Sequence, residues 1–188
     1  MFSSSILQLL FSLLGMAFLV RAWLYAIRLH PFNPFSQTIF KATDWAVLSL
    51  RKLVPNRQYL DWPSLLGAYL TALIFFCVQL LAIERLSPST LILPILLMAL
   101  LEMIRWAMSM IFWLTIAQAI LSWVNPQAPI MPILRTLTDP LLQPIRRVMP
   151  NLGALDLSPI VLILGSQLLS HLVLRAQFAV LMPAVAPL

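Results

Sequence analysis

Four long apolar runs constrain this chain more than any other feature. They extend over residues 6–27, 62–83, 91–124 and 157–182. A helix of about 20 apolar residues crosses the roughly 30 Å hydrocarbon core of a bilayer. Hydrophobic residues make up 61% of the 188 residues and charged residues only 10%, whereas a soluble domain is closer to a quarter charged. The sequence therefore predicts an all-α membrane protein with four transmembrane helices and excludes an ordinary soluble globule.

The third run is too long for one upright span. Its 34 residues correspond to about 51 Å of helix at 1.5 Å per residue. Pro94, Glu102 and Arg105 interrupt only its first part. We therefore expect the span at 104–124, preceded by an apolar lead-in at 91–103 that lies in or folds along one leaflet. The first run has no positive segment before it, so we expect a retained span rather than a cleaved signal peptide.

Basic residues gather in the two long segments between runs, 30–61 and 125–156. They are Lys41, Arg51, Lys52, Arg57, Arg135, Arg146 and Arg147. The short connector after the second run carries only Glu84 and Arg85. Because basic loops stay on the cytoplasmic side, we expect both long loops in the cytoplasm of a bacterium and both termini outside its inner membrane.

The two halves of the chain resemble each other. A shift of 95 residues aligns 22–61 with 117–156 without a gap, and ten of the 40 pairs are identical. Each copy is a span, a loop and a span, and two spans per copy make the repeats parallel. The first repeat, 1–90, has spans at about 6–28 and 62–83 and a loop helix at about 36–54. The second, 91–188, has the lead-in, spans at about 104–124 and 158–182, and a loop helix at about 132–149.

Each loop predicts a short amphipathic helix in the membrane interface, with apolar residues toward lipid and cations toward headgroups. Asp44 and Asp139 are expected to cap its start, with Pro140 in the first helical position. Pro144 is expected to kink the second copy. In that copy Leu141, Leu142, Ile145 and Val148 fall on one side. Bracing of the bundle and recognition of lipid or a partner stay open as alternatives.

Two further aspartates, Asp61 and Asp156, directly precede spans. They predict an N-cap of the following helix. An ion pair back to Arg51 or Arg146 is the alternative, and both interactions are compatible.

The tract TDPLLQPIRRVMPNLGALDLSP, with SWVNP before it and a diverged first copy, resembles the YggT family, also called YlmG-like. The resemblance covers nearly the whole chain. It implies a multi-pass inner-membrane protein without an established enzymatic activity, and roles in osmotic or envelope stress tolerance, division, nucleoid organisation or membrane-complex biogenesis. The first copy departs from the motif at Trp45 and Ser49, where the second has prolines. A role for the motif is therefore better placed on the second copy.

Charged residues inside the predicted spans lie far from the loops. Counted from the loop ends of their spans, Arg105 lies about 29 Å in, Arg175 about 27 Å and His171 about 21 Å, with Glu102 one turn beyond Arg105. These four residues predict a polar cluster near the outer leaflet, with Glu102 as the counter-charge. Snorkelling to headgroups and a solute or proton site are the alternative interpretations.

Arg21 lies about 12 Å from the cytoplasmic end of its span and shares one stripe with Tyr25 and Arg28. It is expected to snorkel toward the cytoplasm, or to contact a partner helix or a headgroup. Gln79, Gln118 and Gln167 are able to bond across helices at about 1 kcal/mol each.

Catalytic constellations are missing from the sequence. Two histidines and one cysteine cannot form a zinc or haem site, and there is no phosphate loop or nucleophile–base pair. We therefore expect no enzyme, no cofactor and no nucleic-acid partner.

The favoured hypothesis is a membrane scaffold or assembly factor that contacts anionic headgroups, a second copy of itself, or a membrane or cytoplasmic protein. The residues proposed for these contacts are Asp139, Arg146, Arg147, Arg51, Lys52, Arg21 and Arg28. A small oligomeric channel or transporter for ions or osmolytes is the alternative.

Overall fold

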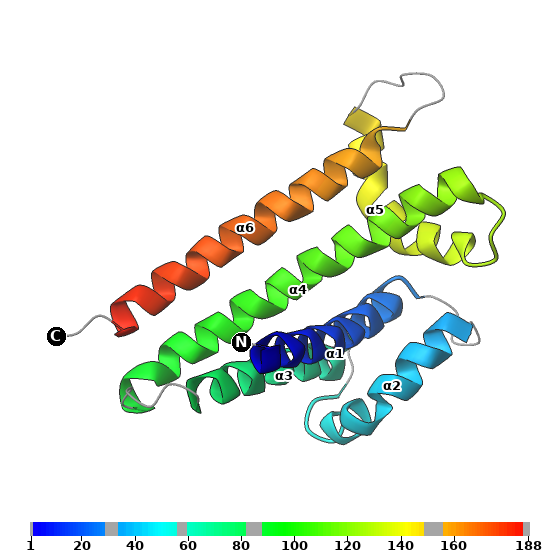
Figure 1. The fold of residues 1–188 in the computed structure, drawn as a ribbon. Helices are drawn as coiled ribbons and strands as arrows, with labels where there is room; N and C mark the ends of the chain where they lie inside the picture. The colour runs from blue at the N-terminus through cyan, green and yellow to red at the C-terminus, as the bar shows by residue number, and fades with distance from the viewer. Residues whose placement is uncertain (1, 29–33, 56–59, 82–87, 149–155, 186–188) are drawn as a thin grey trace. The chain divides into compact units, whose positions relative to one another are not determined.

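The computed structural model is all-helical and describes residues 2–28, 34–55, 60–81, 88–148 and 156–185 (Figure 1). Its helices are α1 (Phe2–Ala26), α2 (Pro34–Leu50), α3 (Trp62–Leu81), α4 (Pro88–Val124), α5 (Met131–Val148) and α6 (Ser158–Val185). Arg57, Glu84, Arg85 and the last residues of the predicted elements 62–83 and 132–149 lie outside the described residues.

Four of these helices are long and apolar enough to cross a membrane, as the sequence predicts. The candidate spans are Ser5–Ala26, Trp62–Gln79, Ile92–Val124 and Ser158–Met182. The predicted lead-in and the predicted third span are not separate elements, because both belong to the continuous helix α4. The sequence has neither glycine nor proline between residues 95 and 124, so nothing after Pro94 interrupts the backbone hydrogen bonds. The position of the lead-in relative to a bilayer stays a prediction.

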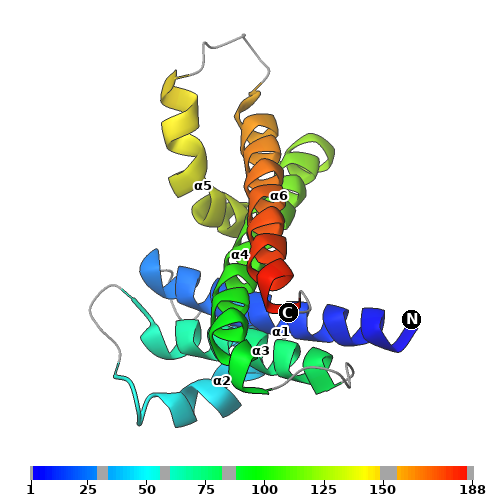
Figure 2. The same ribbon diagram turned by 90° about the vertical axis from the view of Figure 1, so that its left-hand side faces the viewer.

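The predicted caps of the loop helices are wrong. α2 begins at Pro34 and α5 at Met131, so Asp44, Asp139 and Pro140 all lie inside helices. Proline has no N–H to lose in a first turn and its φ suits a helix. The prolines at the start of each loop therefore begin these helices earlier than the aspartates indicate. α5 also contains Pro144, and Figure 2 shows that this helix bends along its length.

The chain forms two compact units, one of residues 1–107 and 172–188 and the other of residues 108–171. In the first unit α1 packs on α3, and α2 packs on both. Phe18, Ala68 and Ala72 are almost completely buried there. A Cβ added to Gly67 would lie only 3.1 Å from the ring of Phe18, so the small residues of α3 permit this close approach.

The second unit buries one face of α5. Met131, Leu134, Leu137 and Leu142 are at most 5% exposed, whereas Val148 is 85% exposed. The sequence placed Leu142 and Val148 together on a side that faces lipid. Leu142 is instead fully buried inside the unit, and exposed Val148 is the last residue of α5.

We predict that Gly15→Ala destabilises the first unit by about 1–3 kcal/mol, the usual cost of overpacking. An added Cβ would overlap the indole ring of Trp106, which is itself buried. Thermal unfolding in detergent, followed by circular dichroism, measures this change. Gly165→Ala is the matched control, since a Cβ there meets nothing within 4 Å. Equal stability of the two variants contradicts the prediction.

Candidate functional site

A buried arginine joins the three helices of the first unit. Arg21 of α1 is 4% exposed. Its Nη1 donates to Thr43 Oγ1 at 2.8 Å and to Asp44 Oδ1 at 2.7 Å, both on α2. Its Nε lies 3.5 Å from Asp61 Oδ2, at the start of α3, and the guanidinium carbon is 4.9 Å from the centroid of the Phe40 ring. Arg21 therefore contacts neighbouring helices, which was the alternative expectation, and its burial does not fit a side chain that snorkels out of the protein.

Asp61 contacts both the first turn of α3 and the guanidinium of Arg21. Its backbone carbonyl accepts from the N–H groups of Ser64 and Leu65, and its Oδ2 accepts from Ser64 Oγ at 2.6 Å. Asp61 thus occupies the position just before α3, as the sequence predicts, but its carboxylate accepts from the hydroxyl of Ser64 and from no backbone N–H group among the described residues. The alternative ion pair is formed with Arg21 rather than with Arg51. The carboxylate is 1% exposed and its Oδ1 has no hydrogen-bond partner among the described residues, so Arg21 supplies its neighbouring positive charge.

In the second unit a more exposed arginine joins the corresponding aspartates. Arg146 Nη1 lies 3.1 Å from Asp139 Oδ1, and its Nε lies 2.9 Å from Asp156 Oδ2. The arginine side chain is 38% exposed. Asp156 Oδ1 also accepts from the backbone N–H of Ser158 at 2.9 Å. The predicted N-cap and the predicted ion pair at Asp156 are both present.

The pKa of Asp156 reflects these partners. Burial by itself raises the pKa of this carboxyl, but hydrogen bonds from Ser158 and Arg146 and the charge of Arg146 outweigh burial and hold the pKa below its ordinary value of 3.8. Each of these partners interacts more strongly with the ionised form.

The third polar cluster consists of Glu102 and Arg105, which the sequence predicted, and Gln177, which it did not. Glu102 is 1% exposed. Its Oε2 accepts from Arg105 Nε at 2.9 Å and from Gln177 Nε2 at 2.8 Å, and its Oε1 lies 2.5 Å from Arg105 Nη2. Gln177 lies on α6, and no charge marked it in the sequence. His171 and Arg175, the other predicted members, are exposed and form no ion pair among the described residues.

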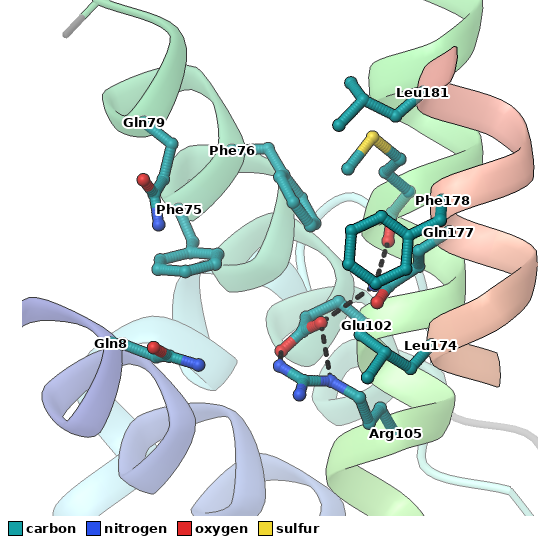
Figure 3. A pocket seen from close by; sticks show the side chains of 11 residues that line it. Gln8, Phe75, Phe76, Gln79, Glu102, Arg105, Leu174, Gln177, Phe178 and Leu181 are labelled. Atoms are coloured by element: carbon teal, nitrogen blue, oxygen red, sulfur yellow. Dashed lines mark hydrogen bonds and ion pairs between the residues drawn. The ribbon is translucent and has the colours of Figure 1, made fainter. Parts of the chain in front are cut away.

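A cavity of about 190 Å³ lies beside this cluster. Figure 3 shows the Glu102–Arg105 pair and Gln177 on one side of it, with Gln8 pointing from α1 toward the pair. Its other walls are mainly aromatic and aliphatic: Phe75, Phe76, Met98, Leu174, Phe178 and Leu181. The polar and apolar groups that line the cavity are suited to hydrogen bonding and apolar contact. The described residues contain no group of three or more metal-ligating side chains.

The remaining predicted contact residues lie at the loops. Arg51, Lys52 and Arg147 are exposed. Arg28 follows α1 with a positive φ of 53°, in the turn that leads toward α2. Gln118 forms one of the predicted bonds between helices, since it pairs with the buried Thr138 of α5. Thr43 and Thr138, which are identical residues in the alignment of the two halves, are both buried and bond to a side chain of another helix.

Four helices suited to crossing a bilayer define the class of this chain, a polytopic α-helical membrane protein. It matches the CCB3/YggT family over residues 1–82 and 97–177 and belongs to that family. This result confirms the resemblance seen in the sequence.

Its relatives are bacterial. "Uncharacterized protein in proC 3'region" of Vibrio alginolyticus is 38% identical over 170 residues, 90% of this chain and 91% of that protein. "Uncharacterized protein YggT" of Escherichia coli K12 is 35% identical over 161 residues, 85% of this chain and 82% of that protein. "Uncharacterized protein PA0392" of Pseudomonas aeruginosa is 33% identical over 172 residues, 90% and 87% of the two chains. No solved structure matches the chain.

We predict that Arg21→Met destabilises the protein by about 3–5 kcal/mol, because it leaves the buried Asp61 without a counter-charge. Denaturant unfolding in detergent measures the loss. Asp61→Asn in the same chain should restore part of it. Arg146→Met is the control: it removes a similar bridge between two aspartates, but a solvent-screened one worth at most about 1 kcal/mol. Equal losses in the two single variants contradict the buried network.

We predict that Asp156 contributes to stability only above acidic pH. Its pKa is lowered by folding, so its contribution is fully present above the unfolded value near 3.8 and is lost as the pH falls through the lower folded value. The difference in thermal midpoint between the natural chain and Asp156→Asn should be constant from pH 7 to 5 and shrink below pH 4. A difference that grows on acidification has the wrong sign and refutes this assignment.

Proposed function

We propose that this protein is a non-enzymatic membrane scaffold whose loop helices α2 and α5 lie along the cytoplasmic leaflet of the inner membrane. Its basic loop residues would engage anionic headgroups, and its apolar spans would contact lipid and either a second copy or another membrane protein. Such a scaffold suits the stress-tolerance and membrane-organisation roles that the resemblance implies. The exposed face of α2 is the observation that supports this proposal best.

That face combines apolar and cationic side chains at helical spacing. Trp45 and Leu48 are 66% and 53% exposed. Exposed Lys41 lies one turn before Trp45, and exposed Lys52 lies in the turn that follows the end of α2 at Leu50. Tryptophan favours the boundary between hydrocarbon and water, and lysine reaches headgroups while its stem stays on apolar surface. A face of this composition is suited to the membrane interface, whereas large exposed side chains would be a liability in water.

The two loops differ in how many of their cations are free. In the second loop Arg146 already bridges Asp139 and Asp156, and exposed Arg135 and Arg147 form no ion pair among the described residues. In the first loop Arg21 takes that place, and exposed Lys41, Arg51 and Lys52 form no ion pair among the described residues. We therefore place headgroup binding mainly on the first loop, although the family motif is better preserved in the second.

Matching contacts in the two halves support the proposed parallel repeat. Thr43 and Thr138 occupy equivalent positions, and each bonds to a residue of the preceding span, Arg21 in one case and Gln118 in the other. The aspartate pairs that flank them are each bridged by one arginine. Two loops built in this way, on the same side of the bilayer, would present their cations to one leaflet.

Exposed apolar residues near the start of α1 leave room for a protein partner within the membrane. Ile6, Leu9, Leu10 and Leu13 are each more than half exposed. Lipid chains or a second copy of the chain would cover this stripe.

We predict that Arg51→Gln with Lys52→Gln weakens selection of anionic lipid several-fold, since each cation near such a surface contributes about 1 kcal/mol. Spin-labelled phosphatidylglycerol and phosphatidylcholine, compared in vesicles that contain the protein, report this selection as a ratio of bound fractions. Arg146→Gln is the control because that cation is already paired. Unchanged selection in the double variant would overturn the assignment to the first loop.

A further inference from the structure

The cavity beside Glu102 lies at the ends of the spans that are remote from the basic loops. Gln8, Gln79, Arg105 and Gln177 come from α1, α3, α4 and α6, and all four line it. Counted along its own helix, each lies roughly 26–29 Å from the loop end. That length is close to the thickness of the hydrocarbon core. In an upright span whose loop end lies at one surface of the bilayer, this length would bring the polar groups of the cavity close to the headgroups of the other leaflet.

Most of the acceptor capacity of the buried Glu102 carboxylate is already used within the protein. Its two oxygens already accept three hydrogen bonds, two from Arg105 and one from Gln177. Its side chain is 2% exposed, whereas that of Arg105 is 25% exposed. The part of the ion pair that faces the cavity is thus the guanidinium, whose charge favours a ligand with acceptor oxygens.

Arg105 has donors to spare for such a ligand. A guanidinium carries five N–H groups, and Glu102 takes one from Nε and one from Nη2. Both hydrogens of Nη1 and one of Nη2 remain. The amides of Gln8 and Gln79 add further donors along the wall, and Figure 3 shows Gln8 aimed at the guanidinium. Planar, multiple donation of this kind is what binds carboxylate and phosphate groups in proteins.

The rest of the wall is suited to hydrocarbon. Phe75, Phe76 and Phe178 surround the space together with methionine and leucine side chains (Figure 3). Phe178 is 56% exposed, so this wall continues outward to the surface of the span. A ligand that fits both parts has a phosphate-type anion next to an apolar chain.

We propose that the cavity binds a phospholipid of the leaflet opposite the basic loops, with its phosphodiester against Arg105 and its first acyl methylenes along the phenylalanines. The volume of about 190 Å³ takes the phosphate and the adjoining glycerol, and the acyl chains leave along Phe178. Free phosphate shares the anionic chemistry but not the apolar part. This site is separate from the headgroup contacts of α2.

Native mass spectrometry of the full chain, titrated with phosphatidylglycerol in detergent, tests the proposal. Arg105→Gln should weaken lipid binding at least tenfold. Leu174→Trp should do the same by filling the cavity, and it leaves the Glu102–Arg105 pair intact if the first variant does not fold. Arg175→Gln is the matched control: this exposed arginine neighbours Leu174 but does not line the cavity, and its variant should bind lipid as the natural chain does.

Three results would overturn the proposal. The first is lipid binding by Leu174→Trp that equals that of the natural chain. The second is an equal loss in Arg175→Gln, which indicates attraction to charge in general. The third is thermal stabilisation by inorganic phosphate alone that matches stabilisation by lipid, which assigns the cavity to a free anion.

Discussion

Removing charges from water requires each of them to find an opposite charge and enough hydrogen-bond partners, and this requirement organises the polar part of the protein. Moving an ion into a medium of low dielectric costs several kcal/mol even after relaxation. Buried Arg21 is paired with two aspartates and bonds to Thr43. Buried Glu102 is paired with Arg105 and accepts a hydrogen bond from Gln177. Both networks join different helices. Helix packing among lipids gains little from apolar contact alone, so these bridges give the first unit much of its specificity.

In each half one arginine bridges two aspartates, but the two arginines come from different parts of the repeat. In the first half the bridge between the aspartates comes from the span, by way of Arg21, and the loop cations stay exposed. In the second half the loop supplies the bridge itself, by way of Arg146. Among the described residues the first loop keeps Lys41, Arg51 and Lys52 exposed and without an ion pair, and the second keeps Arg135 and Arg147.

Periodicity and length were sufficient to predict the four apolar helices, since each depends on many residues at once. The position of Asp61 just before α3 followed from the sequence, whereas the bond of its carboxylate to the Ser64 hydroxyl did not. The predicted loop helices begin within two residues of α2 and α5. The caps at Asp44 and Asp139 are wrong because proline and aspartate are both start signals. Gln177 was missed for a different reason: it is uncharged, and its role depends on a contact with Glu102, 75 positions away. His171 was predicted to join the polar cluster around Glu102 because it is polar and lies within a span. It is instead exposed.

The positions of the polar groups along the first unit also bear on whether one chain alone could form a pore. Its two networks lie at opposite ends of the spans, one around Arg21 and one around Glu102. Between them, Thr71 Oγ1 donates to the carbonyl of Gly67 and Ser12 Oγ to that of Leu9, each within its own helix. A hydroxyl that is satisfied in this way offers little to a passing ion, which needs a series of groups to replace its water. These two hydroxyls therefore give no support to a pore through the first unit alone.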